Sequence, residues 1–187
     1  ASSMPIRDVE QYLGAGDHLP RVLSNRGANG IDGTVSTAFG VAGASDDPVT
    51  LLIGDVALAH DIGGLLAARR LELELTIVLL NNDGGGIFHF LPVSGEADVF
   101  ERHVATPHGL EFRHAAALYG FDHVLASTTA ELRAALGAGG GTRLVEVRTD
   151  RAENLELHRR VAEAASGALR ELDLSLSPTA PAASPEA

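Results

Sequence analysis

Residues 49–86 read VTLLIGDVALAHDIGGLLAARRLELELTIVLLNNDGGG, and this stretch decides the fold class. Residues 49–53 and 75–80 are short apolar runs rich in Val, Ile and Leu, which is typical of strands that are buried on both faces. Residues 57–70, which lie between them, have the composition of a helix. A strand, a helix and a second strand in this order predict a parallel βαβ unit.

The rest of the chain continues this alternation of strand and helix. We expect further strands at residues 21–23, 121–125 and 143–147, and further helices at residues 3–12, 33–43, 111–119, 129–136 and 155–172. Alternation of this kind is found in sheets of parallel strands that are covered by helices. The predicted fold is therefore α/β, with a parallel β-sheet and helices on both of its faces.

The two ends of the chain differ from its middle. The helix at residues 3–12 opens with Ser3 as a cap and Pro5 in its first turn, and no strand precedes it. Because such a helix follows a strand in an α/β fold, we expect the first strand to be truncated and the chain to be cut from a longer one. Residues 173–187 are rich in Ser, Pro and Ala, which predicts a disordered tail after a single domain at residues 1–172.

Composition excludes several classes of function. The formal net charge is −11 at pH 7, which disfavours binding to the phosphate backbone of nucleic acids. Every basic residue is an arginine and there is no cysteine, so lysine Schiff bases, P-loops, disulfides and thiolate metal sites are excluded. With no signal peptide and no apolar run near the roughly 20 residues that cross a bilayer, we expect a cytoplasmic protein without a membrane partner.

Polar residues follow the two strands of the predicted βαβ unit. Asp55 comes directly after the first strand, and Asn82 follows the second. Parallel strands end at the same edge of a sheet, where ligands bind in open α/β folds. A carboxylate, an amide oxygen and the backbone carbonyl of Gly84 are hard oxygen ligands that suit Mg²⁺ or Mn²⁺. The pattern favours a cation that holds a diphosphate; the alternative is a plain turn with an Asp cap, followed by a loop.

Gly54-Asp55 and Asn81-Asn82, at this spacing, resemble the cofactor motif of thiamine-diphosphate enzymes, with Val56 in place of that motif's second glycine. Three segments resemble one family more closely, the 2-succinyl-5-enolpyruvyl-6-hydroxy-3-cyclohexene-1-carboxylate (SEPHCHC) synthases. They are SNRGANGIDGTVST at residues 24–37, NDGGGIF at residues 82–88 and TPHGL at residues 106–110. The resemblance covers residues 1–172, and it implies the C-terminal, diphosphate-binding domain of such an enzyme.

The resemblance implies an activity for the whole protein. That activity is a transferase reaction of menaquinone biosynthesis, in which 2-oxoglutarate is decarboxylated and its succinyl-semialdehyde unit is added to isochorismate. The cofactors are thiamine diphosphate and Mg²⁺ or Mn²⁺. No catalytic residue is expected in this chain, because the activating glutamate of the family lies in an N-terminal domain, usually of the partner subunit. We therefore expect the isolated chain to be inactive and the full-length protein to be a homodimer or homotetramer.

The resemblance also implies roles for individual residues. Ile31 would support the bent cofactor with a stiff, branched side chain, and arginines would bind the substrates' carboxylates with their planar, two-pronged guanidinium groups. The expected cofactor contacts are Gly54, Asp55, Val56, Ala57, Ile31, Asn82 and Gly84, of which Asp55, Asn82 and Gly84 bind the metal. The expected substrate contacts are Ser3, Arg7, Arg26, Ile87, Phe88 and Leu91.

Alternative functions remain open on the sequence alone. The chain could belong to another thiamine-diphosphate enzyme, of the acetolactate synthase or 2-oxoacid decarboxylase type, or be a non-catalytic module of the same fold. A nucleotide-binding or flavodoxin-like domain is disfavoured, because the glycines at residues 27–30 have the wrong spacing for the dinucleotide fingerprint. The sequence does not determine the roles of His60, His89, His108 and His114. For His108, a structural role is favoured over a catalytic one.

Overall fold

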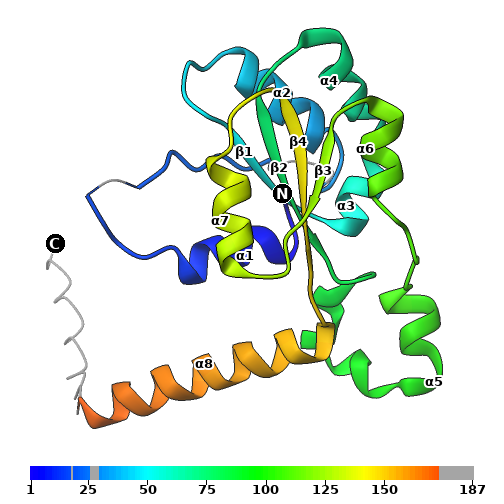
Figure 1. The fold of residues 1–187 in the computed structure, drawn as a ribbon. Coiled ribbons are helices and arrows are strands. Elements are labelled where there is room, and N and C mark those ends of the chain that lie inside the picture. The colour runs from blue at the N-terminus through cyan, green and yellow to red at the C-terminus, as the bar shows by residue number, and fades with distance from the viewer. Residues whose placement is uncertain (18, 26–29, 173–187) are drawn as a thin grey trace, which may run out of the picture.

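The computed structural model describes residues 1–17, 19–25 and 30–172. Its centre is a sheet of four parallel strands in the order β1-β2-β4-β3 (Figure 1). The register aligns Leu52 of β1 with Val78 of β2 and Val145 of β4. The strands are β1 (Thr50–Gly54), β2 (Leu75–Asn81), β3 (Asp122–Leu125) and β4 (Thr142–Arg148). The four strands predicted for these regions are confirmed to within one residue at each end.

The larger hydrophobic core fills one face of the sheet. Leu and Ile side chains of β1 and β2 alternate toward this face, as the two-residue period of a strand requires. They pack in one cluster with Val35 and Phe39 of α2, Leu58 of α3 and Ala116 of α6, all of which are almost fully buried. The covering helices are α2 (Thr34–Gly43), α3 (Asp55–His60) and α6 (Arg113–Tyr119).

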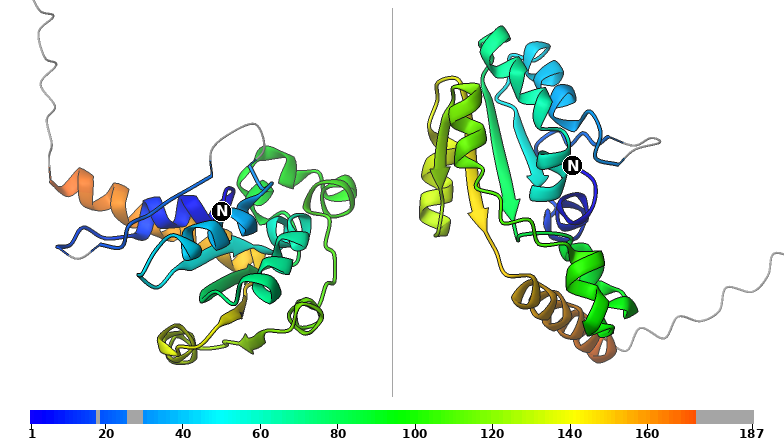
Figure 2. Two further views of the ribbon diagram at one scale, coloured as in Figure 1. Left: turned by 90° about the horizontal axis from the view of Figure 1, so that it is seen from above. Right: turned by 90° about the vertical axis from the view of Figure 1, so that its right-hand side faces the viewer.

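The opposite face carries a smaller core. Val145 of β4 packs there with Ala126 and with Ala135 of α7 (Thr129–Gly137). A capping box starts α7, because the Thr128 side chain accepts the Glu131 N–H while the Glu131 carboxylate accepts the Thr128 N–H. Helices lie on both sides of the sheet (Figure 2), so the predicted α/β architecture is confirmed.

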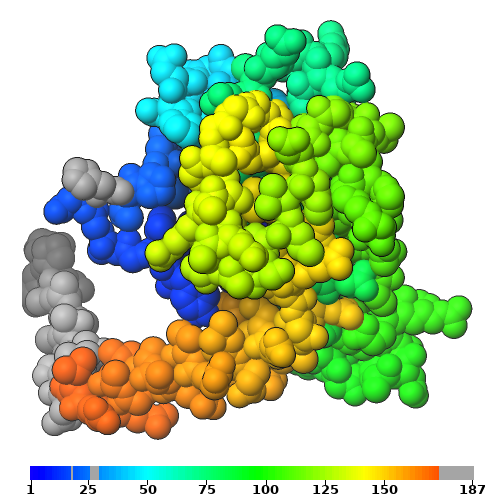
Figure 3. Space-filling view, in the orientation of Figure 1, coloured from blue at the N-terminus to red at the C-terminus, as the bar shows by residue number. Residues whose placement is uncertain are grey.

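A third group of elements lies at the carboxyl end of the strands (Figures 1 and 3). It comprises α1 (Met4–Tyr12), α8 (Arg151–Glu171), η2 (Gly86–Phe90), η3 (Pro92–Gly95), α5 (Ala97–Phe100) and the π-helical turn η4 (Glu101–Ala105). The buried ring of His158 on α8 joins three of them, since it contacts the Tyr12 hydroxyl at 3.1 Å and meets the ring of Phe90 edge-on. None of the described helices is long and apolar enough to cross a lipid bilayer.

The single helix predicted for residues 57–70 is wrong. The segment is instead α3, a 3-10 turn η1 (Ile62–Leu65) and a short helix α4 (Leu66–Leu71). The break coincides with Gly63 and Gly64, which are poor residues for a helix interior. A Cβ atom on Gly64 would lie 2.9 Å from Cβ of Val35, so the chain here is held against α2. Contact with another helix therefore overrides a continuous helical pattern.

The strand predicted for residues 21–23 is also wrong. These residues form no strand, and the side chains of Val22 and Leu23 are more than half exposed, at 52% and 54%. A short β-rich run becomes a strand only if another strand offers its backbone groups, and none of the described strands pairs with this segment.

The remaining helices follow the predictions with small shifts. α1, α2, α6 and α7 begin and end within two residues of their predicted bounds. α8 begins earlier than residue 155, because Asp150 caps it by accepting the N–H groups of Ala152 and Glu153. The short helical turns of residues 86–105 were not predicted. The expected disordered tail at residues 173–187 lies outside the described residues.

The packing of Gly64 against α2 yields a stability prediction. Gly64→Ala should lower the free energy of unfolding by about 1–3 kcal/mol, because the added methyl group overpacks against Val35. Gly63→Ala is the matched control, since a Cβ atom there meets nothing within 4 Å. It should be neutral or stabilising by about 0.4–1 kcal/mol through the unfolded state. Urea unfolding of the two variants measures the difference, and equal stabilities would contradict the packing argument.

Candidate functional site

Asp55 is the centre of the candidate site. It is the first residue after β1 and its side chain is almost completely buried, with 3% of the residue exposed. One carboxylate oxygen, Oδ1, accepts the Val56 N–H at 2.7 Å. The other, Oδ2, accepts the N–H groups of Asn82 at 3.1 Å and Gly84 at 3.0 Å. The ends of β1 and β2 are thus joined by Asp55, and the three residues expected to bind a metal lie together.

A glycine loop follows β2, and a Cβ atom on any of its three glycines would come too close to a neighbouring atom. Gly84 has φ +135°, and a Cβ atom on it would lie 2.3 Å from the Ala105 carbonyl oxygen. A Cβ atom on Gly85 would collide with the ring of Phe88 at 2.6 Å, and one on Gly86 would lie 2.4 Å from Nδ2 of Asn82. The Gly85 N–H donates to the same Ala105 carbonyl at 2.7 Å. The loop is therefore packed against the end of η4 through backbone contacts.

The side-chain oxygen of Asn82 has unused hydrogen-bonding capacity. Oδ1 of Asn82 is buried and has no hydrogen-bond partner, whereas buried polar atoms are almost always paired. Among residues 1–17, 19–25 and 30–172, no three His, Asp or Glu side chains gather into a metal site. A cation at this edge would instead use a carboxylate, an amide oxygen and a backbone carbonyl, together with oxygens of its own ligand. That set of hard oxygens fits Mg²⁺ or Mn²⁺ bound to a diphosphate.

His108 is a component of the site that the sequence did not predict to lie beside Asp55. Its ring is mostly buried, and Nε2 lies 3.2 Å from Oδ2 of Asp55, although not in hydrogen-bond geometry. Nδ1 accepts the Leu110 N–H at 3.0 Å, and the ring meets Phe112 edge-on. The ring therefore fills the space beside the buried carboxylate. The structural role that the sequence favoured for His108 agrees with these contacts.

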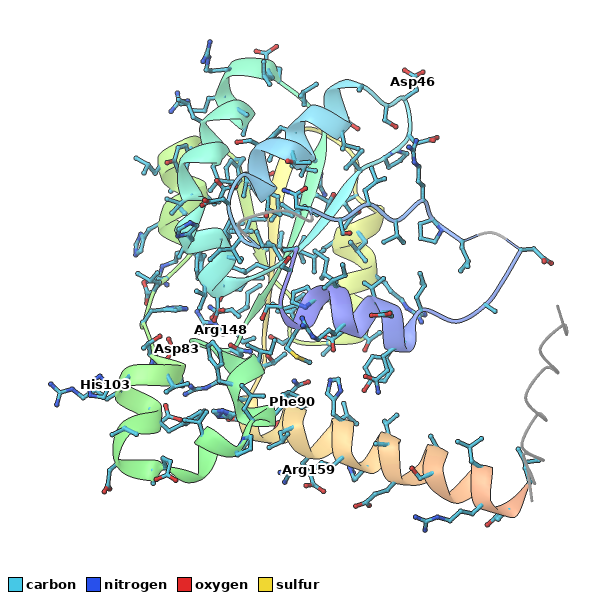
Figure 4. The ribbon with its side chains drawn as sticks, turned by 180° about the vertical axis from the view of Figure 1, so that it is seen from behind. Asp46, Asp83, Phe90, His103, Arg148 and Arg159 are labelled. Atoms are coloured by element: carbon cyan, nitrogen blue, oxygen red, sulfur yellow. The ribbon has the colours of Figure 1, made fainter. Side chains whose placement is uncertain are left out.

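Asp83 joins the glycine loop to the loop that carries His108. Its Oδ1 accepts the backbone N–H groups of His108 at 2.9 Å and Gly109 at 2.7 Å. The hydrogen bond from Gly109, with a further one from His108, holds the pKa of the Asp83 carboxyl below its ordinary value. Sequence analysis missed this residue, although it stands inside the Asn-Asn-Asp-Gly stretch that was singled out. Asp83 lies at the carboxyl end of the sheet, as does Arg148 (Figure 4).

The expected substrate contacts on α1 are adjacent to each other. The Arg7 guanidinium is exposed and donates from Nη1 to the Ser3 carbonyl at 2.7 Å. Ser3 has φ 75° and its side chain makes no capping hydrogen bond, so the predicted cap role is wrong. Its hydroxyl group is not used at the start of the helix. Arg26, the third expected polar contact, lies outside the described residues.

The expected apolar contacts lie next to the glycine loop. Ile87 and Phe88 belong to η2 and Leu91 follows it. Phe88 and Leu91 are 38% and 48% exposed, so they form surface beside the site and are not part of the hydrophobic core. Ile31 is partly buried and packs against the larger core. In the first turn of α3, Val56 is exposed and Ala57 is buried.

The contacts of the other three histidines, His60, His89 and His114, do not include Asp55. His60 pairs with Asp32 at the surface, and His114 pairs with Glu111 at 3.0 Å. His89 contacts the ring of Phe100, and burial lowers its pKa below the ordinary value. None of these contacts includes a residue of the glycine loop.

The glycine loop yields a prediction. Gly84→Ala should destabilise the protein by about 1–3 kcal/mol, because its Cβ atom would collide with the Ala105 carbonyl and its backbone conformation is one that alanine rarely adopts. The displaced loop should also lose affinity for a diphosphate with Mg²⁺. Gly95→Ala, whose Cβ atom meets nothing within 4 Å, is the control. Thermal unfolding and titration calorimetry measure both effects; a Gly84→Ala protein that behaves like Gly95→Ala would contradict the described loop packing.

Comparison with known proteins places this geometry in a family. Residues 7–147 match the family model described as "Thiamine pyrophosphate enzyme, C-terminal TPP binding domain". A 2-succinyl-5-enolpyruvyl-6-hydroxy-3-cyclohexene-1-carboxylate synthase of Rubrobacter xylanophilus is 50% identical over 170 residues, which are 89% of this chain and 29% of that protein. The synthase of Myxococcus xanthus is 49% identical over 175 residues, 91% of this chain and 30% of that protein. The chain thus spans less than a third of the length of these curated relatives.

Solved structures agree with this fold. A thiamine diphosphate-dependent 4-hydroxybenzoylformate decarboxylase of Rhodococcus jostii RHA1 superposes with a TM-score of 0.51 and is 30% identical, covering 60% of this chain and 22% of the other. A benzoylformate decarboxylase of Polynucleobacter necessarius, 21% identical with a TM-score of 0.52, shares the fold over 66% of this chain and 24% of its own. This chain belongs to the family of C-terminal thiamine pyrophosphate (thiamine diphosphate) binding domains of thiamine pyrophosphate enzymes.

Proposed function

We propose that the chain is the diphosphate- and metal-binding domain of a synthase that decarboxylates 2-oxoglutarate and adds the succinyl-semialdehyde unit to isochorismate in menaquinone biosynthesis. The observation that carries the proposal is the buried Asp55 carboxylate, held by the loop in which Asn82 keeps an unpaired oxygen. The choice of substrates is supported by the sequence resemblance and by relatives of 49–50% identity that bear the name of this synthase.

The metal would be held by Asp55, the Asn82 carboxamide oxygen and the Gly84 carbonyl oxygen. Mg²⁺ or Mn²⁺ accepts such hard oxygen ligands, and phosphate oxygens would complete its coordination. Gly54 and the first turn of α3, with Val56 and Ala57, would border the diphosphate. When bound, thiamine diphosphate supplies the nucleophilic carbon and the electron sink that decarboxylation of a 2-oxo acid needs.

The remaining expected contacts have physical tasks that suit this reaction. Ile31 would support the bent cofactor, because its partly buried side chain packs against the core and is stiff. Ser3, Arg7 and Arg26 would bind and orient the substrates' carboxylates through hydrogen bonds and charge. Ile87, Phe88 and Leu91 would cover the substrates with an apolar wall that excludes water.

The proposal extends to parts of the protein beyond this chain. The glutamate that activates the cofactor would come from an N-terminal domain, usually of the partner subunit, so the full-length protein would act as a homodimer or homotetramer. A cytoplasmic location is part of the same proposal. These points rest on the resemblance to the synthase family.

Asp55 provides the direct test of cofactor binding. In the full-length protein, Asp55→Ala should weaken binding of thiamine diphosphate with Mg²⁺ by about 100-fold or more, since even outer-shell partners of a metal contribute about 10–100-fold. Asp46→Ala removes the same charge from an exposed position at the opposite end of the sheet (Figure 4) and should bind like the unaltered protein. Titration calorimetry measures both affinities. Unchanged affinity in Asp55→Ala would remove the proposed metal site.

A substrate assay separates the proposal from its nearest alternative. The 30% identical decarboxylase favours a 2-oxoacid decarboxylase as the second candidate. The full-length protein should consume 2-oxoglutarate in the presence of isochorismate and leave pyruvate and benzoylformate largely unused. Residues 1–187 alone should show no turnover, because the activating glutamate would lie in the N-terminal domain. Decarboxylation of an aryl 2-oxo acid by the full-length protein, or turnover by the isolated chain, would refute the respective part of the proposal.

A further inference from the structure

Glu146 is a buried carboxylate that the proposed function does not use. It lies on β4, next to Leu79 of β2 and Leu125 of β3, and only 1% of it is exposed. A buried charge is costly unless it is paired and fully hydrogen-bonded. The contacts of the Glu146 side chain must therefore compensate for its loss of hydration.

Three side chains donate to Glu146. Oε1 accepts from Nδ2 of Asn81 at 2.8 Å and from Nε of Arg148 at 2.9 Å, and Oε2 accepts from Nε2 of His123 at 2.7 Å. Burial alone would raise the pKa of Glu146, but the hydrogen bonds from Arg148, Asn81 and His123 together hold this pKa below its ordinary value. The group is thus an ionised acceptor for all three.

An ionised Glu146 determines which way the Asn81 amide faces. Because a carboxylate can only accept, the NH₂ group of Asn81 must point to Glu146 and its oxygen must point away. That oxygen, Oδ1, accepts the backbone N–H of Asp83 at 3.1 Å. Asp83 has φ 58°, a left-handed conformation that this local hydrogen bond favours. Glu146 therefore acts on the loop through Asn81.

The chain of contacts continues to the neighbouring loop. The Asp83 carboxylate accepts the N–H groups of His108 and Gly109, and the residues on either side of Asp83 donate their N–H groups to Asp55. Two hydrogen-bonded groups thus hold the loop after β2. Asp55 holds the N–H groups of Asn82 and Gly84, and Glu146, through Asn81, holds Asp83 between them.

We propose that Glu146 is a positioning residue for the cofactor site, which sets the orientation of Asn81 and, through it, the shape of the glycine loop and the docking of residues 107–109. The inference rests on the proposed function, because it assigns Glu146 to the same diphosphate site. Glu146 contacts neither cofactor nor substrate in this role.

The polarity of the Glu146–Asn81 hydrogen bond allows a double-variant test in the full-length protein. Glu146→Leu removes the acceptor for the Asn81 NH₂ group, and Asn81→Asp places two carboxylates side by side. Glu146→Gln is the conservative variant, because its oxygen can still accept from Asn81 and Arg148 while its NH₂ group faces Nε2 of His123, which accepts in one tautomer. Glu146→Gln with Asn81→Asp reverses the polarity of the pair, and the new carboxylate can still accept the Asp83 N–H. Glu146→Leu and Asn81→Asp should each weaken binding of thiamine diphosphate with Mg²⁺ by about 10–100-fold. Glu146→Gln alone and the double variant should both bind to within about threefold of the unaltered protein.

The expected change in affinity is opposite in sign to the change that loss of the charge alone would cause. Glu146→Leu removes a negative charge near a proposed diphosphate site, which by Coulomb's law alone would strengthen binding. Arg148→Gln is the matched control, because it removes another partner of the same carboxylate, is 60% exposed as a side chain, and leaves the Asn81 link in place. It should leave affinity unchanged. Affinity that follows melting temperature across all variants, Arg148→Gln included, would overturn the positioning role in favour of a purely structural one.

A second measurement does not depend on the cofactor. Hydrogen exchange of the His108 and Gly109 amides in cofactor-free protein should be faster in Glu146→Leu and in Asn81→Asp, and slow again in the double variant. If the unaltered protein binds no thiamine diphosphate, the proposed function fails, while exchange still tests the Glu146 link. If the buried variants do not fold, Asp83→Ala removes the next step of the same chain of contacts. Its half-exposed carboxylate accepts the His108 and Gly109 N–H groups, and its loss should weaken binding about tenfold. A double variant that binds no better than Asn81→Asp, or unchanged binding by Asp83→Ala, would overturn the inference.

Discussion

The hydrogen bonds between the Asp55 carboxylate and the backbone of residues 82–84 are the constraint on which the site depends. They join the ends of β1 and β2, and they bring a buried charge to the edge of the sheet where ligands of α/β folds bind. Burial of this carboxylate is tolerated because the backbone N–H groups of Val56, Asn82 and Gly84 donate hydrogen bonds to it. The same burial would make its interaction with a cation stronger than at an exposed position.

Charge at this end of the sheet is divided between two buried carboxylates with different surroundings. Asp55 accepts hydrogen bonds from backbone N–H groups, one of which belongs to Asn82, whose own side-chain oxygen is unpaired. Glu146 is enclosed by Asn81, His123 and Arg148, and its hydrogen-bonding capacity is used within the protein. The first arrangement suits a metal site, and the second suits the support of one.

Much of the fold could be predicted because its signals are local. The apolar runs of β1, β2 and β4 and the positions of Asp55 and Asn82 after them follow from composition and spacing alone. The break between α3 and α4 could not be predicted, because it depends on the contact of Gly64 with Val35 of another helix. Residues 21–23 have the composition of a strand, but none of the described strands pairs with them. Composition alone does not show whether a neighbouring strand is present to pair with.

The sequence by itself determined the class of the protein: a parallel α/β sheet, polar residues at the ends of adjacent strands, and a glycine run that permits close backbone approach. Only the tertiary structure decided which polar groups carry the site. In the sequence, Glu146 and His108 look like ordinary residues of a strand and a loop. In the folded sheet, Glu146 is a buried carboxylate with three hydrogen-bond partners, and the His108 ring occupies the space beside Asp55. The physical reason is that burial and hydrogen-bond partners are set by distant segments, whereas strand and turn preferences are set by neighbouring residues.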